Sequence, residues 1–106
     1  MGNESTGIDR ESGVITKERQ KVEEPPLFKV LLHNDDYTTM DFVVMVLEAV
    51  FNKDAAAATE IMLNVHKKGI GLAGVYTRDV AETKVAVVHD LSRKNEHPLR
   101  CTMEKA

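Results

Sequence analysis

The first strand and helix of this chain are predicted from residues 28–51, which form the stretch FKVLLHNDDYTTMDFVVMVLEAVF. Residues 28–32 have the length and apolar content of a buried strand. Residues 34–37 are Asn-Asp-Asp-Tyr, and the first three carry side chains that bond to nearby backbone groups and favour a turn. The stretch therefore predicts a strand that ends in a polar turn.

A helix is predicted directly after this turn. Thr38 is followed three residues later by Asp41, which approximates a capping box, so we expect the helix to begin at Thr38. Its apolar residues recur at helical spacing and form one stripe, made up of Phe42, Val43, Val46, Leu47, Val50 and Phe51.

The remaining elements continue the alternation of helices and strands. They are a helix over residues 55–68, a strand over 70–76, a helix over 78–95 and a strand over 99–104. Asp54 can cap the first of these helices, and Gly69 can end it. The order β-α-α-β-α-β predicts an α+β fold, in which three helices cover one face of a three-stranded antiparallel sheet in a compact two-layer sandwich.

The helix over residues 78–95 carries a lysine at an unusual place. Its apolar arc on a helical wheel comprises Val80, Ala81, Val85, Val87, Val88 and Leu91. Lys84 falls near the middle of that arc, where a lysine usually extends its charged group to the edge of the buried surface. It also marks a place where the helix can meet another protein.

The 106 residues leave room for one small domain. Residues 1–24 contain six acidic and four basic side chains with scattered aliphatic residues. Such a segment buries too little apolar surface to offset the entropy lost on ordering. We expect residues 1–26 to form a disordered extension and residues 27–106 to form the folded domain.

Composition excludes several classes of protein. The net charge of −3 and the isoelectric point near 5.8 argue against a nucleic-acid binder. The sequence shows neither a secretory signal nor the run of about 18 apolar residues that a membrane span needs, so we expect a cytoplasmic protein without membrane contact. Cys101 is the single cysteine, which excludes an internal disulfide, and its alternating neighbours predict a small inward-facing strand residue.

Two groups of polar residues are candidates for catalysis or metal binding. Adjacent carboxylates such as Asp35 and Asp36 tend to point in different directions, so this pair is better explained as turn residues than as paired catalytic acids. His33, one of these aspartates and His66 are a possible metal set, but no two histidines have the spacing of a helical metal motif. We therefore expect no metal and no cofactor.

A third group suits an ammonium ligand. Asn34, an aspartate and His66 supply amide, carboxylate and imidazole acceptors for its hydrogen bonds. An apolar floor beside them could be formed by Met40, Val43, Met62, Val65 and Leu99. An amine acceptor beside an apolar hole is what binding of a free N-terminal residue requires. The same apolar stripe is also explained as plain core, and the residues alone leave both interpretations open.

Four blocks of sequence resemble a known family. They are NDDYTTMDFV (34–43), IMLNVH (61–66), VAETKV (80–85) and EHPLRCTMEK (96–105). In order and spacing over residues 27–106 they are similar to the ClpS family, whose members capture proteins by the N-terminal residue and deliver them to a Clp ATPase. The resemblance implies an adaptor with no enzymatic activity, and a fold shared with the C-terminal domain of the ribosomal stalk protein.

The resemblance also implies roles for individual residues. The positions that engage the substrate's α-amino group, directly or through water, are Asn34, Asp35, Asp36 and His66. The positions that form the pocket for a large apolar first side chain (Leu, Phe, Tyr or Trp) are Thr38, Met40, Val43, Met62, Val65 and Leu99. The positions that dock on the N-terminal domain of a ClpA-type ATPase are Asp79, Glu82, Thr83 and Lys84.

Two positions depart from the family pattern. Thr39 replaces a proline that is common at the first helical position, and Asp79 replaces a glutamate. Two rival functions remain: a small metal- or carboxylate-dependent hydrolase, and an interaction domain of the same fold that does not bind N-termini. We expect the chain to act as a monomer.

Overall fold

The computed structural model describes residues 24–106, so the predicted N-terminal extension lies almost wholly outside the described residues. The elements are β1 (Leu27–His33), α2 (Met40–Ala49), α3 (Ala55–Lys68), β2 (Ile70–Thr77), α4 (Arg78–Lys94) and β3 (Arg100–Lys105). Their order is β-α-α-β-α-β, and the predicted α+β class is confirmed.

The sheet has β1 at its centre, in the strand order β2-β1-β3. Both of its pairings are antiparallel, as the sequence predicts. Ala73 of β2 forms a bulge, because its neighbours Leu72 and Gly74 pair with consecutive residues of β1. Since β1 runs directly into residues 34–39, this loop leaves the sheet from its central strand.

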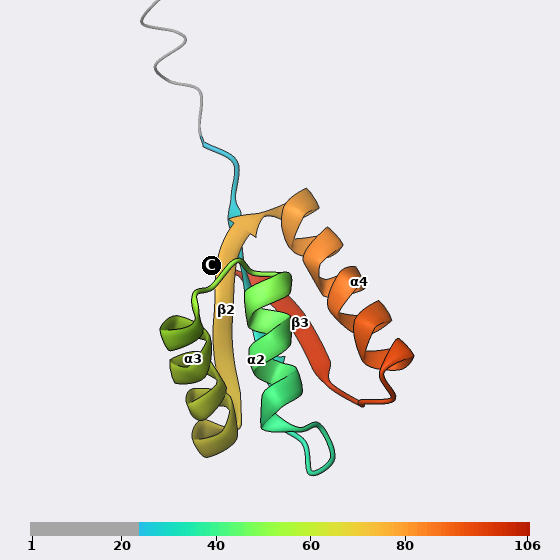
Figure 1. Ribbon diagram of the computed structural model, residues 1–106. Helices are drawn as coiled ribbons and strands as arrows, with labels where there is room; N and C mark the ends of the chain where they lie inside the picture. The colour runs from blue at the N-terminus through green and yellow to red at the C-terminus, as the bar shows by residue number, and fades with distance from the viewer. Residues whose placement is uncertain (1–23) are drawn as a thin grey trace, which may run out of the picture.

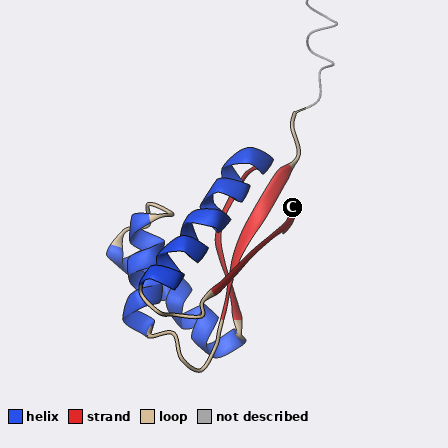
Figure 2. Ribbon diagram, turned by 90° about the vertical axis from the view of Figure 1, so that its right-hand side faces the viewer, coloured by secondary structure: helices blue, strands red, loops and turns tan. Residues whose placement is uncertain are grey.

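The three helices lie over one face of the sheet, which makes the domain two layers thick (Figures 1 and 2). Alternate residues of β1 point toward the helices: Phe28, Val30 and Leu32 are buried, whereas Leu27 and Lys29 are exposed. Val46 and Leu47 of α2 are fully buried against this face. Within residues 24–106, no helix covers the opposite face (Figure 2).

The start of α2 differs from the sequence prediction. The N-cap is Thr39, whose hydroxyl oxygen accepts a hydrogen bond of 3.1 Å from the Phe42 backbone N–H. Thr38 is not the cap, because its own hydroxyl donates to the Asp35 carboxylate at 2.7 Å. The prediction for Thr38 is therefore wrong, and so is the placing of Thr39 at the first helical position. Thr39 supplies a cap that a proline side chain cannot.

Both predicted ends of α3 are confirmed. Asp54 accepts a hydrogen bond of 2.8 Å from the Ala57 backbone N–H at the start of the helix. Gly69 ends the helix with a φ of 86°, in the left-handed region that glycine adopts without steric cost. These caps fix the length of α3, and with it the position of His66 in its last turn.

The buried face of α4 agrees with the predicted arc in part. Ala81, Val88 and Ser92 are buried, whereas Val80 and Val87, placed in the predicted apolar arc, are 43% and 40% exposed. Ser92 is buried because its hydroxyl donates a 2.7 Å hydrogen bond to the Val88 carbonyl and leaves no unpaired polar hydrogen. Four of the six predicted residues, Ala81, Val85, Val88 and Leu91, lie in or against the core, so apolar character alone misplaced only Val80 and Val87.

Cys101 points into the core, as its alternating neighbours predict, and is 2% exposed. Burial raises the pKa of its thiol to about 12, so the thiol stays protonated at neutral pH. Among the described residues, no helix is long and apolar enough to cross a membrane.

Candidate functional site

A pocket of about 240 Å³ opens where the loop after β1 meets the start of α2 and the end of α3. Its three walls come from these three segments. The lining residues are Asn34, Asp35, Asp36 and Thr38 of the loop, Met40 and Val43 of α2, and Met62, Val65 and His66 of α3. Nine of the ten residues predicted to bind a substrate therefore share one pocket.

Asp35 holds the loop wall in shape. One of its carboxylate oxygens accepts hydrogen bonds from the backbone N–H groups of Tyr37 at 2.8 Å and Thr38 at 2.6 Å. The other oxygen accepts the Thr38 hydroxyl. Burial acts to raise the pKa of Asp35, but the hydrogen bonds from Thr38 and Tyr37, helped by nearby His97, hold it below its ordinary value of 3.8. Asp35 is thus an ionised anchor of the loop.

The base of the loop is joined to the neighbouring strand and helix. The Asn34 backbone N–H donates to the Gly69 carbonyl at 2.9 Å, where α3 turns into β2. At the start of α2, the His97 ring lies 4.2 Å from the Phe42 ring, centroid to centroid. The segment before β3 therefore packs against the first turn of α2, and the pocket walls are connected to the rest of the fold.

The floor of the pocket is apolar and buried, and its rim is polar and exposed. Val43, Met62 and Val65 are 5%, 9% and 2% exposed, whereas Met40 at the edge is 44% exposed. α3 can lie close to the sheet because a Cβ atom at Gly71 would come within 2.5 Å of the Val65 side chain. Glycine at this position therefore sets how closely the α3 wall approaches β2.

The polar part of the pocket lining consists mainly of hydrogen-bond acceptors. The rim offers the amide of Asn34, the carboxylates of Asp35 and Asp36 and the imidazole of His66, and the lining includes no lysine or arginine. These groups can accept several hydrogen bonds from a cation. At about 240 Å³ the pocket is below the range of about 300–1,000 Å³ for drug-sized ligands. It fits a single amino-acid side chain with a charged group at the rim.

Two predicted positions lie elsewhere. Leu99 is 3% exposed in the core just before β3 and does not line the pocket, so its binding role stays a prediction. His33, a member of the alternative metal set, shares a 2.7 Å hydrogen bond with the Thr102 hydroxyl across the sheet. Burial, with Arg100 next in effect, lowers the pKa of His33 against an opposing effect of Glu104. Its place is the β1–β3 pairing and not the pocket.

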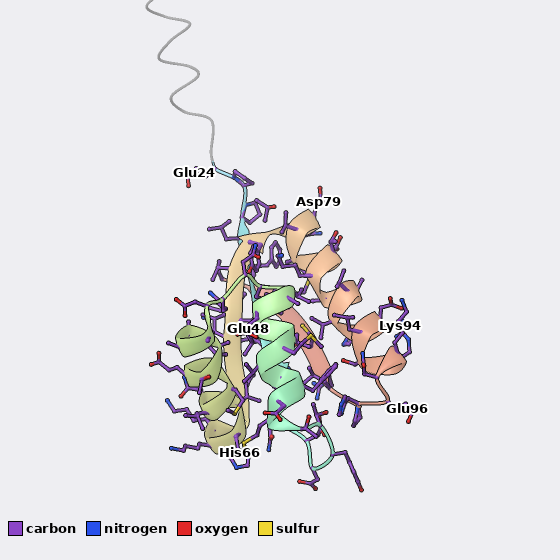
Figure 3. The ribbon with its side chains drawn as sticks, in the orientation of Figure 1. Glu24, Glu48, His66, Asp79, Lys94 and Glu96 are labelled. Atoms are coloured by element: carbon purple, nitrogen blue, oxygen red, sulfur yellow. The ribbon has the colours of Figure 1, made fainter. Side chains whose placement is uncertain are left out.

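The four residues predicted to contact an ATPase all lie in the first two turns of α4. Asp79, Glu82 and Thr83 are exposed and share one helix face, while Lys84 beside them is half-buried. Figure 3 shows Asp79 at the end of the molecule where Glu24 lies, and His66 at the opposite end. The pocket and the α4 surface are therefore separate regions.

The predicted site omitted the groups that surround the end of the Lys84 side chain. Its Nζ atom donates a 2.7 Å hydrogen bond to the Val50 carbonyl and lies near the rings of Phe51 and Tyr76. Lys84 and Val50 are 34 residues apart, so no local spacing indicates the contact. In the sequence, only the position of Lys84 within the apolar arc of its helix indicated that its side chain has a special contact.

Comparisons with known proteins agree with this geometry. Residues 23–102 match the family model described as the ATP-dependent Clp protease adaptor protein ClpS. The chain is 60% identical over 91 residues to the ClpS adapter protein of Desulfatibacillum aliphaticivorans, covering 86% of this chain and 88% of that protein. It is 54% identical over 105 residues to the ClpS adapter protein of Caulobacter vibrioides strain NA1000, covering 99% and 94%.

A solved structure extends the similarity to three dimensions. Agrobacterium tumefaciens ClpS2, bound to L-phenylalaninamide, superposes with a TM-score of 0.75 at 40% identity, covering 78% of this chain and all of that one. Together with the family match over residues 23–102, this similarity shows the family as well as the fold. The chain belongs to the ClpS family of ATP-dependent Clp protease adaptor proteins, and it is an adaptor with a Clp ATPase as partner and not an enzyme.

Proposed function

We propose that the pocket binds the N-terminal residue of proteins destined for degradation, through its free α-amino group and its large apolar side chain. The observation that carries this proposal is the pairing of hydrogen-bond acceptors at the rim with an apolar floor in a pocket sized for one side chain. Agrobacterium ClpS2 holds L-phenylalaninamide, a molecule with a free amine and an aromatic side chain, which supports the same ligand chemistry here.

Each group in the pocket has a role in this proposal. Asn34, Asp36 and His66 accept hydrogen bonds from the α-ammonium group, directly or through water. Asp35 adds negative charge while it anchors the loop. Leu, Phe, Tyr or Trp enters between Met40 and the floor, since burying a large apolar side chain is favourable and a volume of about 240 Å³ has room for one of them.

The test compares two peptides that differ only in N-terminal acetylation. A Leu-initiated peptide should bind with measurable affinity in fluorescence anisotropy, and its acetylated twin should not, because acetylation removes the charge and two donors. Asp36→Asn should weaken binding of the free peptide, whereas Glu48→Gln, on the exposed side of α2, should leave it unchanged. Equal binding of the two peptides would instead favour an interaction domain that does not recognise N-termini.

We further propose that the chain, as a monomer, delivers these substrates to a ClpA-type ATPase through Asp79, Glu82, Thr83 and Lys84. The exposed acidic and hydroxyl groups on one face of α4 support this role. The surface lies away from His66, so bound substrate and bound ATPase do not compete for space (Figure 3).

A degradation assay with the ATPase and its peptidase tests delivery. A chain that starts at Pro25 should bind peptide normally but fail to deliver it, because we propose that the residues before the folded domain act at the ATPase. Glu82→Ala should spare peptide binding and weaken docking. Normal delivery by both variants would exclude the delivery role proposed for these segments, while the acetylation test of the pocket would stand.

A further inference from the structure

The Lys84 side chain ends in a defined cradle, formed by the Val50 carbonyl oxygen and the rings of Phe51 and Tyr76. Its Nζ atom lies 2.7 Å from the carbonyl oxygen. It also lies 5.2 Å from the centre of the Tyr76 ring and 5.8 Å from that of the Phe51 ring. Both distances are within the range of about 6 Å in which a ring face attracts a cation.

The carbonyl in this cradle belongs to the end of α2. Val50 is the C-cap of that helix, and the last turn of α2 contains no basic residue. Carbonyl groups at a helix C-terminus carry partial negative charge and attract cations. Lys84 supplies this cation from α4 and uses one of its three ammonium hydrogens, which leaves two for another acceptor.

Gly74 leaves the space that the Tyr76 ring occupies. A Cβ atom at residue 74 would come within 2.6 Å of two carbons of that ring, so the ring rests against the glycine backbone. The ring also packs against Phe51, with the two centroids 6.3 Å apart. A larger residue at position 74 displaces Tyr76 and opens one side of the cradle.

We infer that Gly74, Tyr76 and the Val50 carbonyl are positioning groups that hold the Lys84 ammonium ready to bind a carboxylate of the Clp ATPase. This inference rests on the α4 docking surface proposed above. A free lysine loses rotamer entropy when a partner fixes it, whereas Lys84 is already fixed by three contacts. The cradle thus favours docking without touching the partner.

The test measures two affinities of the full chain, one for the N-terminal domain of the ATPase and one for a Leu-initiated peptide. Tyr76→Leu removes the ring and should weaken docking about 3- to 10-fold, the size of a cation–ring contact with its ordering effect. Tyr76→Phe keeps the ring and should dock within about twofold of wild type. Peptide affinity should stay unchanged in both variants.

A double-mutant cycle separates positioning from a general effect on the fold. In a Lys84→Met background, Tyr76→Leu should cause no further loss of docking, because the positioned group is absent. Additive losses would overturn the inference. Docking of Tyr76→Leu with wild-type affinity would also overturn the inference, while the proposed delivery role would stand. If Tyr76→Leu does not fold, Gly74→Ala, which displaces the ring but retains it, carries the same test.

A spectroscopic measurement is independent of docking. The nuclear magnetic resonance order parameter of the Lys84 side chain should be high in wild type and Tyr76→Phe and low in Tyr76→Leu. A mobile Lys84 in wild type would overturn the inference. Failure of the wild-type chain to bind the ATPase domain at all, with Lys84 ordered, would instead exclude the proposed delivery role.

Discussion

The two ends of α2 are held by different kinds of contact. At its N-terminal end, the Thr39 cap and the Asp35 turn join residues at most three positions apart in the sequence. At its C-terminal end, the Val50 carbonyl is bound by Lys84, 34 residues later. The first end forms one side of the pocket through contacts between residues close in the sequence, and the second connects the helix to α4. Binding and docking should therefore respond to different substitutions.

Asp35→Asn should produce the largest effect on the pocket end. The amide carries one oxygen and cannot accept all three hydrogen bonds, so the loop wall loses its shape. Hydrogen bonds to a charged group contribute about 1.5–3 kcal/mol each, so we expect the affinity for a Leu-initiated peptide to fall about 100-fold.

The matched control for this prediction is Asp36→Asn, which changes the adjacent carboxylate. Asp36→Asn should lower the peptide affinity but not the free energy of unfolding, whereas Asp35→Asn should lower both quantities. Urea denaturation beside the anisotropy titration measures the difference. Equal stability of the two variants would show that Asp35 does not anchor the loop.

Met40→Ala should change which side chains enter the pocket. Met40 stands at the first turn of α2, and a side chain branched at Cβ is wide and stiff where it leaves the backbone. Ile and Val should therefore clash with Met40 where Leu passes. Overpacking costs about 1–3 kcal/mol, so the variant should bind an Ile-initiated peptide on the order of tenfold more tightly than wild type does.

The measurement is a set of dissociation constants for Leu-, Ile- and Val-initiated peptides. Met45→Ala, at an exposed position farther along the same helix, is the control and should leave the preferences as they are. If Met40→Ala rejects Ile as strongly as wild type, another residue sets the preference, and Thr38 and Met62 are the next candidates.

At the opposite end of α2, Lys84→Met should lower the free energy of unfolding by about 1–2 kcal/mol and leave peptide affinity unchanged. Methionine keeps most of the apolar stem but removes the hydrogen bond to the Val50 carbonyl. Urea denaturation and anisotropy measure the two quantities. A loss of peptide affinity would mean that the ends of α2 are coupled and would break the contrast between them.

The Thr39 cap offers a smaller change at the pocket end. Thr39→Ala removes a side-chain cap and should cost about 1 kcal/mol of stability. Thr77 is the N-cap of α4, and no capping hydrogen bond from its side chain is seen in the described structure. Thr77→Ala should therefore cost only a few tenths of that amount, about 0.3 kcal/mol. Equal losses would show that the Thr39 hydrogen bond contributes nothing.

The smallest effect concerns pH. Because the pKa of Asp35 is lower in the folded chain than its ordinary value of 3.8, its ionised form stabilises the fold. This stabilisation is present in full above that ordinary value and is lost as the pH falls through the lower, folded pKa. Wild type should therefore lose more stability than Asp35→Asn between pH 5 and pH 2. Parallel losses would contradict the anchor role.

Most of the fold could be predicted from the sequence, because its signals are local. A cap such as Asp54 acts on a backbone group three residues away, and the left-handed backbone at Gly69 depends on that residue alone. Alternation around Cys101 likewise predicted that its side chain points inward. The residues alone left open whether the apolar stripe is plain core or part of a binding site, and the family resemblance favoured the binding site.

The tertiary structure decided the features that depend on competing hydrogen bonds or on residues far apart in the sequence. The sequence indicated Thr38 as the cap of α2, but Asp35 takes the Thr38 hydroxyl and Thr39 caps the helix instead. The buried face of α4 is set by what packs against the helix, so Val80 and Val87 lie outside it. The partner of Lys84 is a main-chain carbonyl 34 residues away, which no side-chain pattern can indicate. The sequence by itself therefore determined the order of the elements and both ends of α3, while the folded structure decided the cap of α2, the buried face of α4 and the contact of Lys84 with the end of α2.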